Sequence, residues 1–192
     1  MSSLKELFDK FIAGRKALNM SPRTLKSNIS QVSMFMSWLK EKHGITRSEE
    51  LRGIHMQDFQ KYLSEKRTSS GHLLLPRSIN KAVECVRTFL DHLGKGGFVP
   101  VRLYENLDYV KVPDLLPKSV LTHEQVQALV NSVDESSPRG YRDKAILELM
   151  YTNGIRASEL LGLELGKIDF KSATAIIMGK GMKERVVPIG KT

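Results

Sequence analysis

Cysteine, clustered histidine and long apolar runs are all scarce in this 192-residue sequence. Cys85 is the only cysteine, which excludes an internal disulfide framework and fits a reducing cytosol. The five histidines are scattered without metal-ligand spacing, so we expect no metal and no other cofactor. No apolar run is long enough to span a bilayer, and the beginning MSSLKELFDKFIAGRK is amphipathic rather than signal-like. We therefore expect a cytoplasmic protein that makes no membrane contact.

A phosphate-binding loop is also lacking, although MGKGMKERVVPIGKT closes the sequence with Gly-Lys-Thr. Such a loop requires Gly, four further residues and then Gly-Lys-Ser or Gly-Lys-Thr. Arg185 stands where the first glycine is needed. The segment is therefore not a nucleotide site.

Positive charge, by contrast, is abundant and unevenly distributed. The net charge is +9, which favours a polyanionic partner. Residues 1–112 hold 19 Lys and Arg against 11 Asp and Glu, whereas residues 113–192 hold 11 against 10. The excess belongs to the first part of the chain. A basic surface that only promotes solubility remains the alternative.

A break in the helical pattern divides the chain near VKVPDLLPKSVLTHEQ. Pro113 and Pro117 cannot continue a helix, and Thr122 followed by Gln125 has the form of a capping box. We interpret residues 1–112 as one domain, 113–121 as a linker and 122–192 as the incomplete start of a second domain.

The first domain is predicted to be entirely helical. Apolar residues recur at spacings of three and four, which predicts helices at about 3–18, from Ser21-Pro22 to near residue 39, at 56–67 and from Pro76 to Gly94. The expected core positions on the second and fourth helices are Leu25, Ile29, Val32, Phe35 or Met36, Leu39, Ile79, Val83, Val86, Phe89, Leu90 and Leu93.

The second and fourth helices begin with similar sequences, PRTLKSNISQVSMFMSWL and PRSINKAVECVRTFLDHL. Any two amphipathic helices that start with proline look alike, and this explanation stays open. Basic and hydroxyl side chains in a first helical turn nevertheless suit phosphate and base-edge contacts. The candidate DNA-binding residues here are Arg23, Thr24, Lys26, Ser27, Arg77, Ser78, Asn80, Lys81 and Arg87.

The second part has an α/β or α+β pattern. Helices are expected at about 122–133, 139–152 and 156–162, with Leu129 and Met150 among their apolar residues. The runs TAIIM and RVVPI flank GKGMKE, which predicts a β-hairpin. The chain as a whole is thus predicted to be mainly α.

The segments MYTNGIRASELLGLELGKIDF and IIMGKGMKERVVPIG resemble the start of the catalytic domain in tyrosine site-specific recombinases, the phage-integrase and Xer group. The helical part before them is similar to that family's four-helix, SAM-like core-binding domain, and LPKSVLT resembles its interdomain linker. The resemblance covers nearly the whole chain.

This resemblance implies roles for individual residues. In the family a tyrosine attacks a DNA phosphodiester and forms a 3′-phosphotyrosine without metal or nucleotide. Arg156 would be the first catalytic arginine, able to fork onto two phosphate oxygens, and Lys180 would protonate the leaving 5′-oxygen. Glu159 would orient Arg156. Lys183 and Arg185 would contact backbone phosphate or face solvent.

The family's later motifs, His-x-x-Arg and the nucleophilic tyrosine, are not found in this sequence. All five tyrosines precede the hairpin lysine. We therefore expect a truncated recombinase that binds double-stranded DNA but is inactive alone. The resemblance implies a tetramer on DNA for the whole protein and a monomer in solution for this chain.

Two other interpretations remain open. One is a natural integrase-derived regulator that binds DNA without catalysis, which the codons after residue 192 would separate from a truncation. The other is a helical protein-interaction module with incidental basic charge, which salt-dependent DNA binding would exclude.

Overall fold

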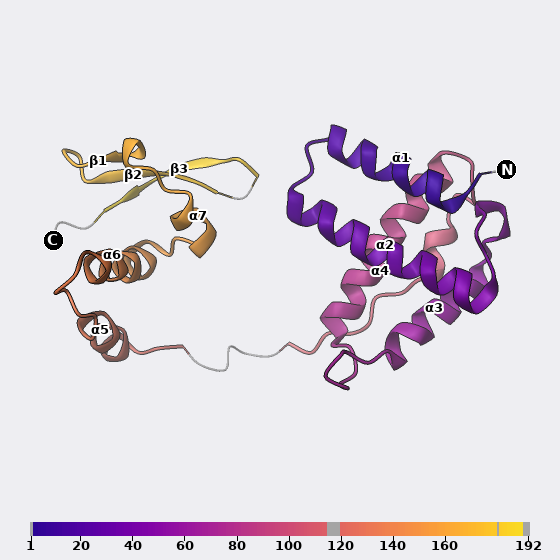
Figure 1. Cartoon of the computed structure of the whole chain (residues 1–192), viewed down its shortest axis with the longest axis horizontal. Coiled ribbons are helices and arrows are strands. Elements are labelled where there is room, and N and C mark those ends of the chain that lie inside the picture. The colour runs from indigo at the N-terminus through magenta and orange to yellow at the C-terminus, as the bar shows by residue number, and fades with distance from the viewer. Residues whose placement is uncertain (1, 115–119, 180, 190–192) are drawn as a thin grey trace. The chain divides into compact units, whose positions relative to one another are not determined.

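The computed structural model describes residues 2–114, 120–179 and 181–189. It divides into two compact units, Met1–Asp114 and Leu115–Thr192, which we call unit 1 and unit 2. Both are visible in Figure 1, and each is described below by itself.

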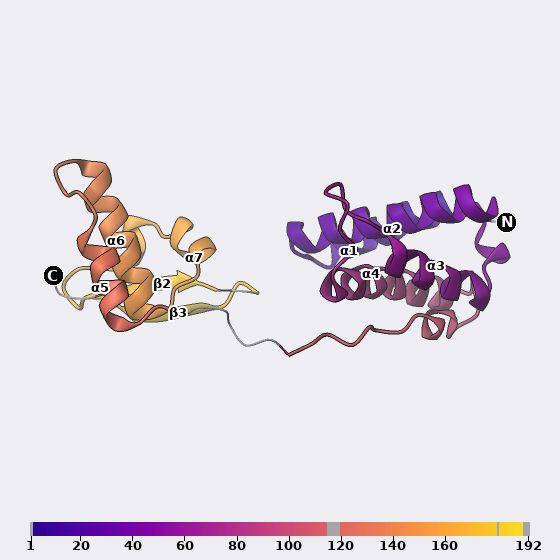
Figure 2. The same cartoon turned by 90° about the horizontal axis from the view of Figure 1, so that it is seen from below.

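Unit 1 is a four-helix domain. Its helices are α1 (Leu4–Ala17), α2 (Pro22–His43), α3 (Gly53–Glu65) and α4 (Pro76–Lys95), with short 3₁₀ turns η1 (Ser48–Glu50) and η2 (Leu103–Asn106). Helix α4 contacts the other three helices and η2, as Figures 1 and 2 show from two directions. It is the central element of the domain.

The apolar stripe of α4 explains this central position. All six apolar residues predicted for its core face are at most 6% exposed. The ring of Phe89 lies 6.0 Å from that of Phe8 and 5.4 Å from that of Phe11, so α4 and α1 share an aromatic contact. Phe35, Trp38 and Phe59 form a second aromatic group between α2 and α3.

On α2 one predicted core position is wrong. Ile29 is 42% exposed, whereas its neighbour Asn28 is 3% exposed. The buried face of the helix runs through Asn28, Val32 and Phe35, so a residue one position further along is rotated by about 100° toward solvent. Asn28 donates from Nδ2 to the carbonyl of Thr24 at 2.7 Å, which offsets part of the cost of its burial, whereas its buried Oδ1 has no hydrogen-bond partner among the described residues.

Helix starts follow the sequence signals closely. Ser21 caps α2 by accepting a hydrogen bond from the N–H of Thr24, with Pro22 at the first helical position. Thr122 and Gln125 form the predicted capping box at the start of α5 (His123–Asn131). Helix α4 also begins at a proline, but Leu75 before it supplies no capping side chain.

Unit 2 combines short helices with a small antiparallel sheet. After α5 come α6 (Pro138–Asn153), α7 (Ala157–Leu161) and the 3₁₀ turn η3 (Leu165–Lys167). The strands are β1 (Ile168–Asp169), β2 (Thr174–Met178) and β3 (Glu184–Pro188), in the order β1-β2-β3. Figure 1 shows α6 and α7 over one face of this sheet.

The mainly α fold with a β-hairpin is therefore confirmed, and β1 is an addition that the sequence did not indicate. Strands β2 and β3 pair with Ile177 opposite Arg185 and Met178 opposite Glu184. The core of unit 2 is small and consists of Ile155, Ala175, Ile177 and Val187. Leu129 and Met150, which we expected on apolar helix faces, are instead 45% and 38% exposed.

Replacing Phe89 with alanine should destabilise unit 1 by about 3–5 kcal/mol, because the ring is fully buried between α1 and α4 and its loss leaves a cavity. Ile29→Ala on the exposed side of α2 should change stability by less than about 1 kcal/mol. Denaturant unfolding followed by the fluorescence of Trp38 measures both. Equal effects of the two variants would contradict the assigned core.

Candidate functional site

Arg156 occupies the turn between α6 and α7. Gly154 ends α6 in the left-handed conformation (φ 58°), which side chains with a Cβ rarely adopt. Arg156 is then the extended N-cap residue of α7. Its N–H donates to Oε2 of Glu159 at 3.1 Å, and its guanidinium Nη1 donates to Oε1 of the same carboxylate at 2.9 Å. The carboxylate of Glu159 thus holds both the backbone and the side chain of Arg156.

The same carboxylate binds a second arginine from the hairpin. Arg185 on β3 donates from Nη1 to Oε1 of Glu159 at 3.1 Å and from Nη2 to Oε2 at 2.7 Å. The sequence led us to expect Arg185 on DNA or in solvent, and in the structure its guanidinium has a protein partner, while its side chain is 37% exposed. The side chain of Glu159 is 4% exposed, so its charge needs these partners.

Two hydrogen-bonded arginines keep Glu159 ionised. Arg185 is the main cause, followed by the N–H of Arg156, and together they lower the pKa of Glu159 from 4.5 to about 2. The pKa of Arg185 is raised in return by its bond to Glu159. The three groups carry a net charge of one positive unit. Arg156 is the more accessible of the two arginines to solvent, because its side chain is 68% exposed and that of Arg185 is 37% exposed.

The hairpin approaches this cluster through a glycine. A Cβ on Gly179 would lie 3.2 Å from Nη1 of Arg185 and 3.6 Å from Oε1 of Glu159, so a larger residue would push on the pair. Gly181 has a φ of 78° and turns the connection to β3. Lys180, the predicted proton donor between these glycines, lies outside the described residues. Lys183 is exposed on the same connection.

In unit 1 the predicted residues at the start of α2 are partly free. Arg23 and Lys26 are exposed. Thr24 shares a hydrogen bond of 2.9 Å with Ser21, and the hydroxyl of Ser27 lies 3.6 Å from the sulfur of Cys85 in the contact with α4. Of the four predicted residues at the start of α2, the two basic ones are therefore the exposed ones.

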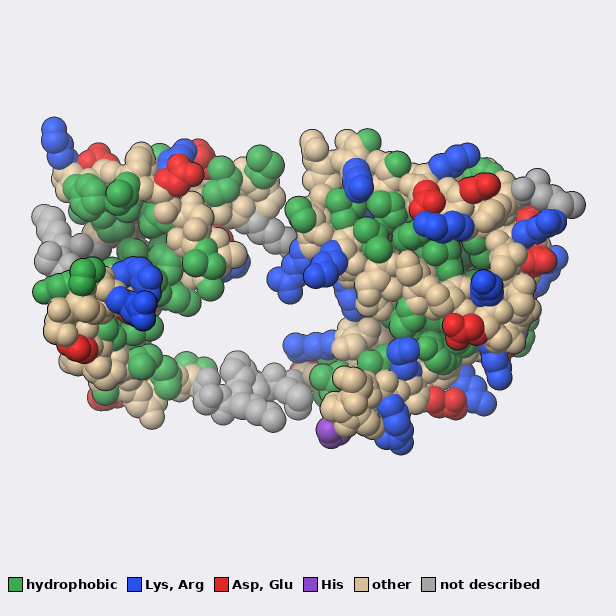
Figure 3. Space-filling model, viewed as in Figure 1, with side chains coloured by type: hydrophobic (Ala, Val, Ile, Leu, Met, Phe, Trp, Pro, Cys, Tyr) green, Lys and Arg blue, Asp and Glu red, His purple; other side chains and the backbone are tan. Residues whose placement is uncertain are grey.

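At the start of α4 the exposed candidates are Arg77, Ser78 and Lys81. Lys81 pairs with Glu84 at 2.9 Å, but both side chains are about half exposed, and such surface pairs are weak. In Figure 3, Lys and Arg side chains are spread over the visible face of unit 1, including the edge where α2 and α4 begin, while most Asp and Glu side chains on this face lie away from that edge.

Asn80 has a different position from its neighbours on α4. Its Nδ2 donates to the carbonyl of Val110 at 2.8 Å, and its Oδ1 accepts from the N–H of Val110 at 2.7 Å. The side-chain amide thus bonds both backbone groups of Val110, as a neighbouring strand would. This internal role accounts for Asn80 without a DNA contact.

Arg87 is likewise engaged within unit 1. Its Nη1 donates to the carbonyl of Leu107, and its guanidinium lies 5.2 Å from the ring centre of Tyr104 and 5.4 Å from that of Tyr109. No sequence pattern indicated these two tyrosines, because the contacts join positions about twenty residues apart. Arg87 secures the chain after η2.

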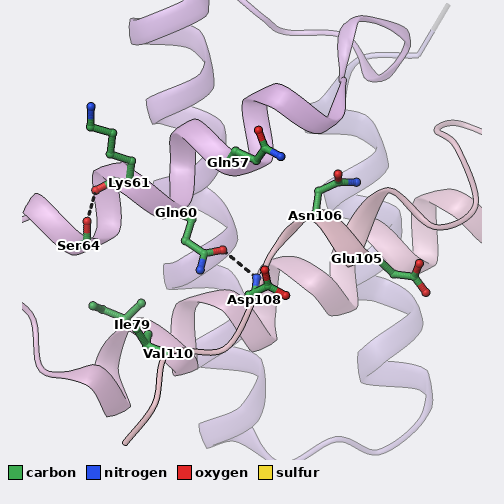
Figure 4. Close-up of a pocket in the computed structure, with 9 residues that line it drawn as sticks. All are labelled: Gln57, Gln60, Lys61, Ser64, Ile79, Glu105, Asn106, Asp108 and Val110. Atoms are coloured by element: carbon green, nitrogen blue, oxygen red, sulfur yellow. Dashed lines mark hydrogen bonds between the residues drawn. The ribbon is translucent and has the colours of Figure 1, made fainter.

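A shallow depression beside this segment, drawn in Figure 4, is not a phosphate site. Gln60 accepts a hydrogen bond from the N–H of Asp108 at 2.8 Å across it. Two carboxylates, Glu105 and Asp108, and one ammonium group, Lys61, line it. This charge balance does not favour an anion.

Residues 2–114, 120–179 and 181–189 have neither a metal-binding cluster nor a membrane-spanning helix. No group of three or more His, Cys, Asp or Glu side chains within them could hold a metal ion. None of the helices in these residues is long and apolar enough to cross a membrane.

Several known proteins are similar to this chain in sequence. Residues 119–192 match the Phage integrase family. The tyrosine recombinase XerC of Myxococcus xanthus is 33% identical over 190 residues, which is 98% of this chain and 60% of that protein. Tyrosine recombinase XerC 2 of Ralstonia nicotianae is 31% identical over 171 residues, 88% of this chain and 49% of that protein. Tyrosine recombinase XerD of Listeria innocua is 29% identical over 192 residues, 100% of this chain and 62% of that protein.

Solved structures share the fold at lower identity. A lambda integrase dimer bound to a COC′ core site has a TM-score of 0.68 and 11% identity, with 97% of this chain and 62% of that chain covered. The Tn1549 transposon integrase in complex with circular intermediate DNA has a TM-score of 0.61 and 16% identity, with 100% and 62% covered.

The chain belongs to the tyrosine recombinase family. It spans between about half and three fifths of the length of the curated relatives named above.

The stability of unit 2 should decrease as the pH falls from about 4.5 toward 2. Ionised Glu159 stabilises the folded state because its pKa is lower there than in the unfolded chain, so the contribution is complete above 4.5 and disappears as the carboxylate takes up a proton near 2. Glu159→Gln should make this decline shallower. Denaturant unfolding followed by the amide signals of β2 and β3 measures it. The control is Glu164→Gln, an exposed carboxylate nearby, which should keep the wild-type decline.

Proposed function

We propose that this chain binds double-stranded DNA within site-specific recombination. The observation that carries the proposal is the charge of unit 1, where residues 1–112 have 19 basic against 11 acidic side chains and Arg23, Lys26 and Arg77 are exposed at two helix starts. Positive side chains at such positions suit DNA phosphates. The Tn1549 integrase in complex with circular intermediate DNA and the lambda integrase dimer bound to a COC′ core site support the same partner.

We propose that residues 1–112 form a core-binding domain and that residues 122–192 form the first portion of a catalytic domain. Residues 113–121 link the two. Arg77, Ser78, Lys81 and Lys183 remain proposed DNA contacts beside Arg23 and Lys26. For Asn80, Arg87 and Arg185 we favour the internal roles described above, because their polar groups are bound within their own units.

For the whole recombinase we propose DNA strand cleavage through a 3′-phosphotyrosine. Arg156 is suited to the scissile phosphate because its guanidinium is exposed yet fixed by a buried carboxylate. A fixed bidentate donor can stabilise the negative charge of a pentavalent phosphate without reorganising during the reaction. Lys180 would protonate the leaving 5′-oxygen. Glu159 supports Arg156 and touches no substrate.

The oligomeric state of this chain differs from the one proposed for the whole recombinase. We propose a tetramer on DNA for the whole recombinase, and a monomer for this chain, which sedimentation without DNA tests. An integrase-derived regulator that binds DNA without cutting it has the same DNA-binding surface, so comparing the gene's coding frame after residue 192 distinguishes the two.

The affinity of the chain for duplex DNA should fall steeply with salt, with a log–log slope near −0.9 for each phosphate contacted. Arg23→Ala with Lys26→Ala should weaken binding and make the slope shallower by up to about 2, because each residue is proposed to neutralise one phosphate. Fluorescence anisotropy over a salt series measures both quantities.

Lys40 and Lys42 provide a matched control. They are exposed on the same helix, roughly 24 Å further along its axis, and their double replacement with alanine removes the same charge. The Lys40 and Lys42 double variant should keep most of the wild-type affinity for DNA and most of the wild-type salt slope. A slope that is flat in the wild type, or equally reduced in both double variants, would refute the proposed interface.

The chain alone should form no covalent adduct with a suicide-nicked recombination-site substrate. Positioned charge does not replace a positioned nucleophile. Tyr151 is the tyrosine to check first, because its hydroxyl lies 2.8 Å from Nδ1 of His123 and it is 47% exposed. Denaturing electrophoresis gives the readout. Any adduct would overturn the prediction, and its loss in Tyr151→Phe would identify Tyr151 as the nucleophile.

A further inference from the structure

Two arginines share the carboxylate of Glu159 unequally. Arg185 binds both oxygens through two guanidinium nitrogens, at 3.1 and 2.7 Å. The side chain of Arg156 reaches only Oε1, through Nη1 at 2.9 Å. Arg185 therefore has the forked geometry of a strong arginine–carboxylate pair, and Arg156 has a single contact.

Strand β3 explains why Arg185 reaches this position. Residues two apart in a strand share a face, and Val187, which lies two residues after Arg185, belongs to the buried core of unit 2. Arg185 thus projects toward the core side of the sheet, where a charge requires a partner. Glu159 on α7 supplies it, and the absence of a side chain at Gly179 leaves room for the pair.

We propose that Arg185 is a positioning residue that keeps Arg156 available for a DNA phosphate. This inference rests on the proposed function. The forked contact of Arg185 fixes the plane of the Glu159 carboxylate and occupies both oxygens, so Arg156 cannot take the forked position itself. The remaining nitrogens of Arg156 stay exposed, in agreement with the 68% exposure of its side chain.

Charge supports the same role. With Arg185 present, the cluster carries one positive unit beside an incoming phosphate. Without Arg185, Glu159 would neutralise Arg156, and the carboxylate would repel the phosphate. Arg156 is only three residues from Glu159 along the chain, so it could close onto both carboxylate oxygens. Loss of Arg185 therefore withdraws Arg156 from the surface instead of releasing it.

The test uses the whole chain, labelled with ¹⁵N and ¹³C, and compares the wild type with Arg185→Met, Arg185→Lys and the control Lys171→Met. Lys171 is exposed in the turn before β2, and its replacement also removes one positive charge. The NMR signals of the Arg156 guanidinium report its hydrogen bonding and rotation. The carboxyl carbon of Glu159 reports its titration, and amide signals of β2 and β3 report whether unit 2 is folded.

In Arg185→Met, the Arg156 guanidinium should rotate more slowly than in the wild type, because it takes the forked position, and the pKa of Glu159 should rise above about 2. In Arg185→Lys, the pKa of Glu159 should be lower than in Arg185→Met, because the ammonium group supplies a positive charge. The Arg156 guanidinium should still rotate slowly, because an ammonium group cannot bind both carboxylate oxygens in a forked contact. Lys171→Met should match the wild type. If Arg185→Met does not fold, the Arg185→Lys comparison decides alone.

Unchanged Arg156 signals in a folded Arg185 variant would overturn the proposal, because a residue that only stabilises the fold would leave them unaltered. A second measurement adds duplex DNA. The wild type should show a shift of the Arg156 signals, and Arg185→Met should lose it. Failure of DNA to bind the wild type at all would refute the proposed function, while the DNA-free signals would still decide the role of Arg185.

Discussion

The carboxylate of Glu159 is the point on which the candidate site of unit 2 depends. It joins the backbone of the α6–α7 turn, the side chain of Arg156 and the guanidinium of Arg185 on β3. A buried carboxylate is costly unless several donors satisfy it, and here the donors come from two elements that are far apart in the sequence. The site and the local fold are therefore stabilised by the same hydrogen bonds.

The candidate DNA-binding residues of unit 1 include an exposed group and an internally bonded group. Arg23, Lys26 and Arg77 project from helix starts, where they are exposed. Arg87 instead secures the chain after η2 through a carbonyl and two aromatic rings, and Asn80 provides a similar anchor with its amide. The apolar stripe of α4 permits this arrangement, since its buried positions hold the helix while adjacent positions remain free for polar contacts.

Periodicity and helix caps made most of the fold predictable. The α4 stripe, the Ser21 cap and the Thr122 capping box depend on residues within a few positions of one another, so the sequence contains their full signal. Ile29 was misplaced because adjacent helix positions differ by only about 100°. The partner of Arg185 was not predictable, because it lies 26 residues away and is reached only after α7 and β3 pack together. The two-residue β1 has too little sequence for any pattern.

Cys85 gives the contact between α2 and α4 a chemical consequence of its own. The thiol is 2% exposed, and burial is the main reason that its pKa is raised. Reagents that modify thiols require the thiolate, so they react with Cys85 only when the two helices separate locally. Because this is the chain's single cysteine, its rate of modification, compared with that of a free thiol, reports the population in which that helix pair is open, without any label introduced elsewhere in the protein.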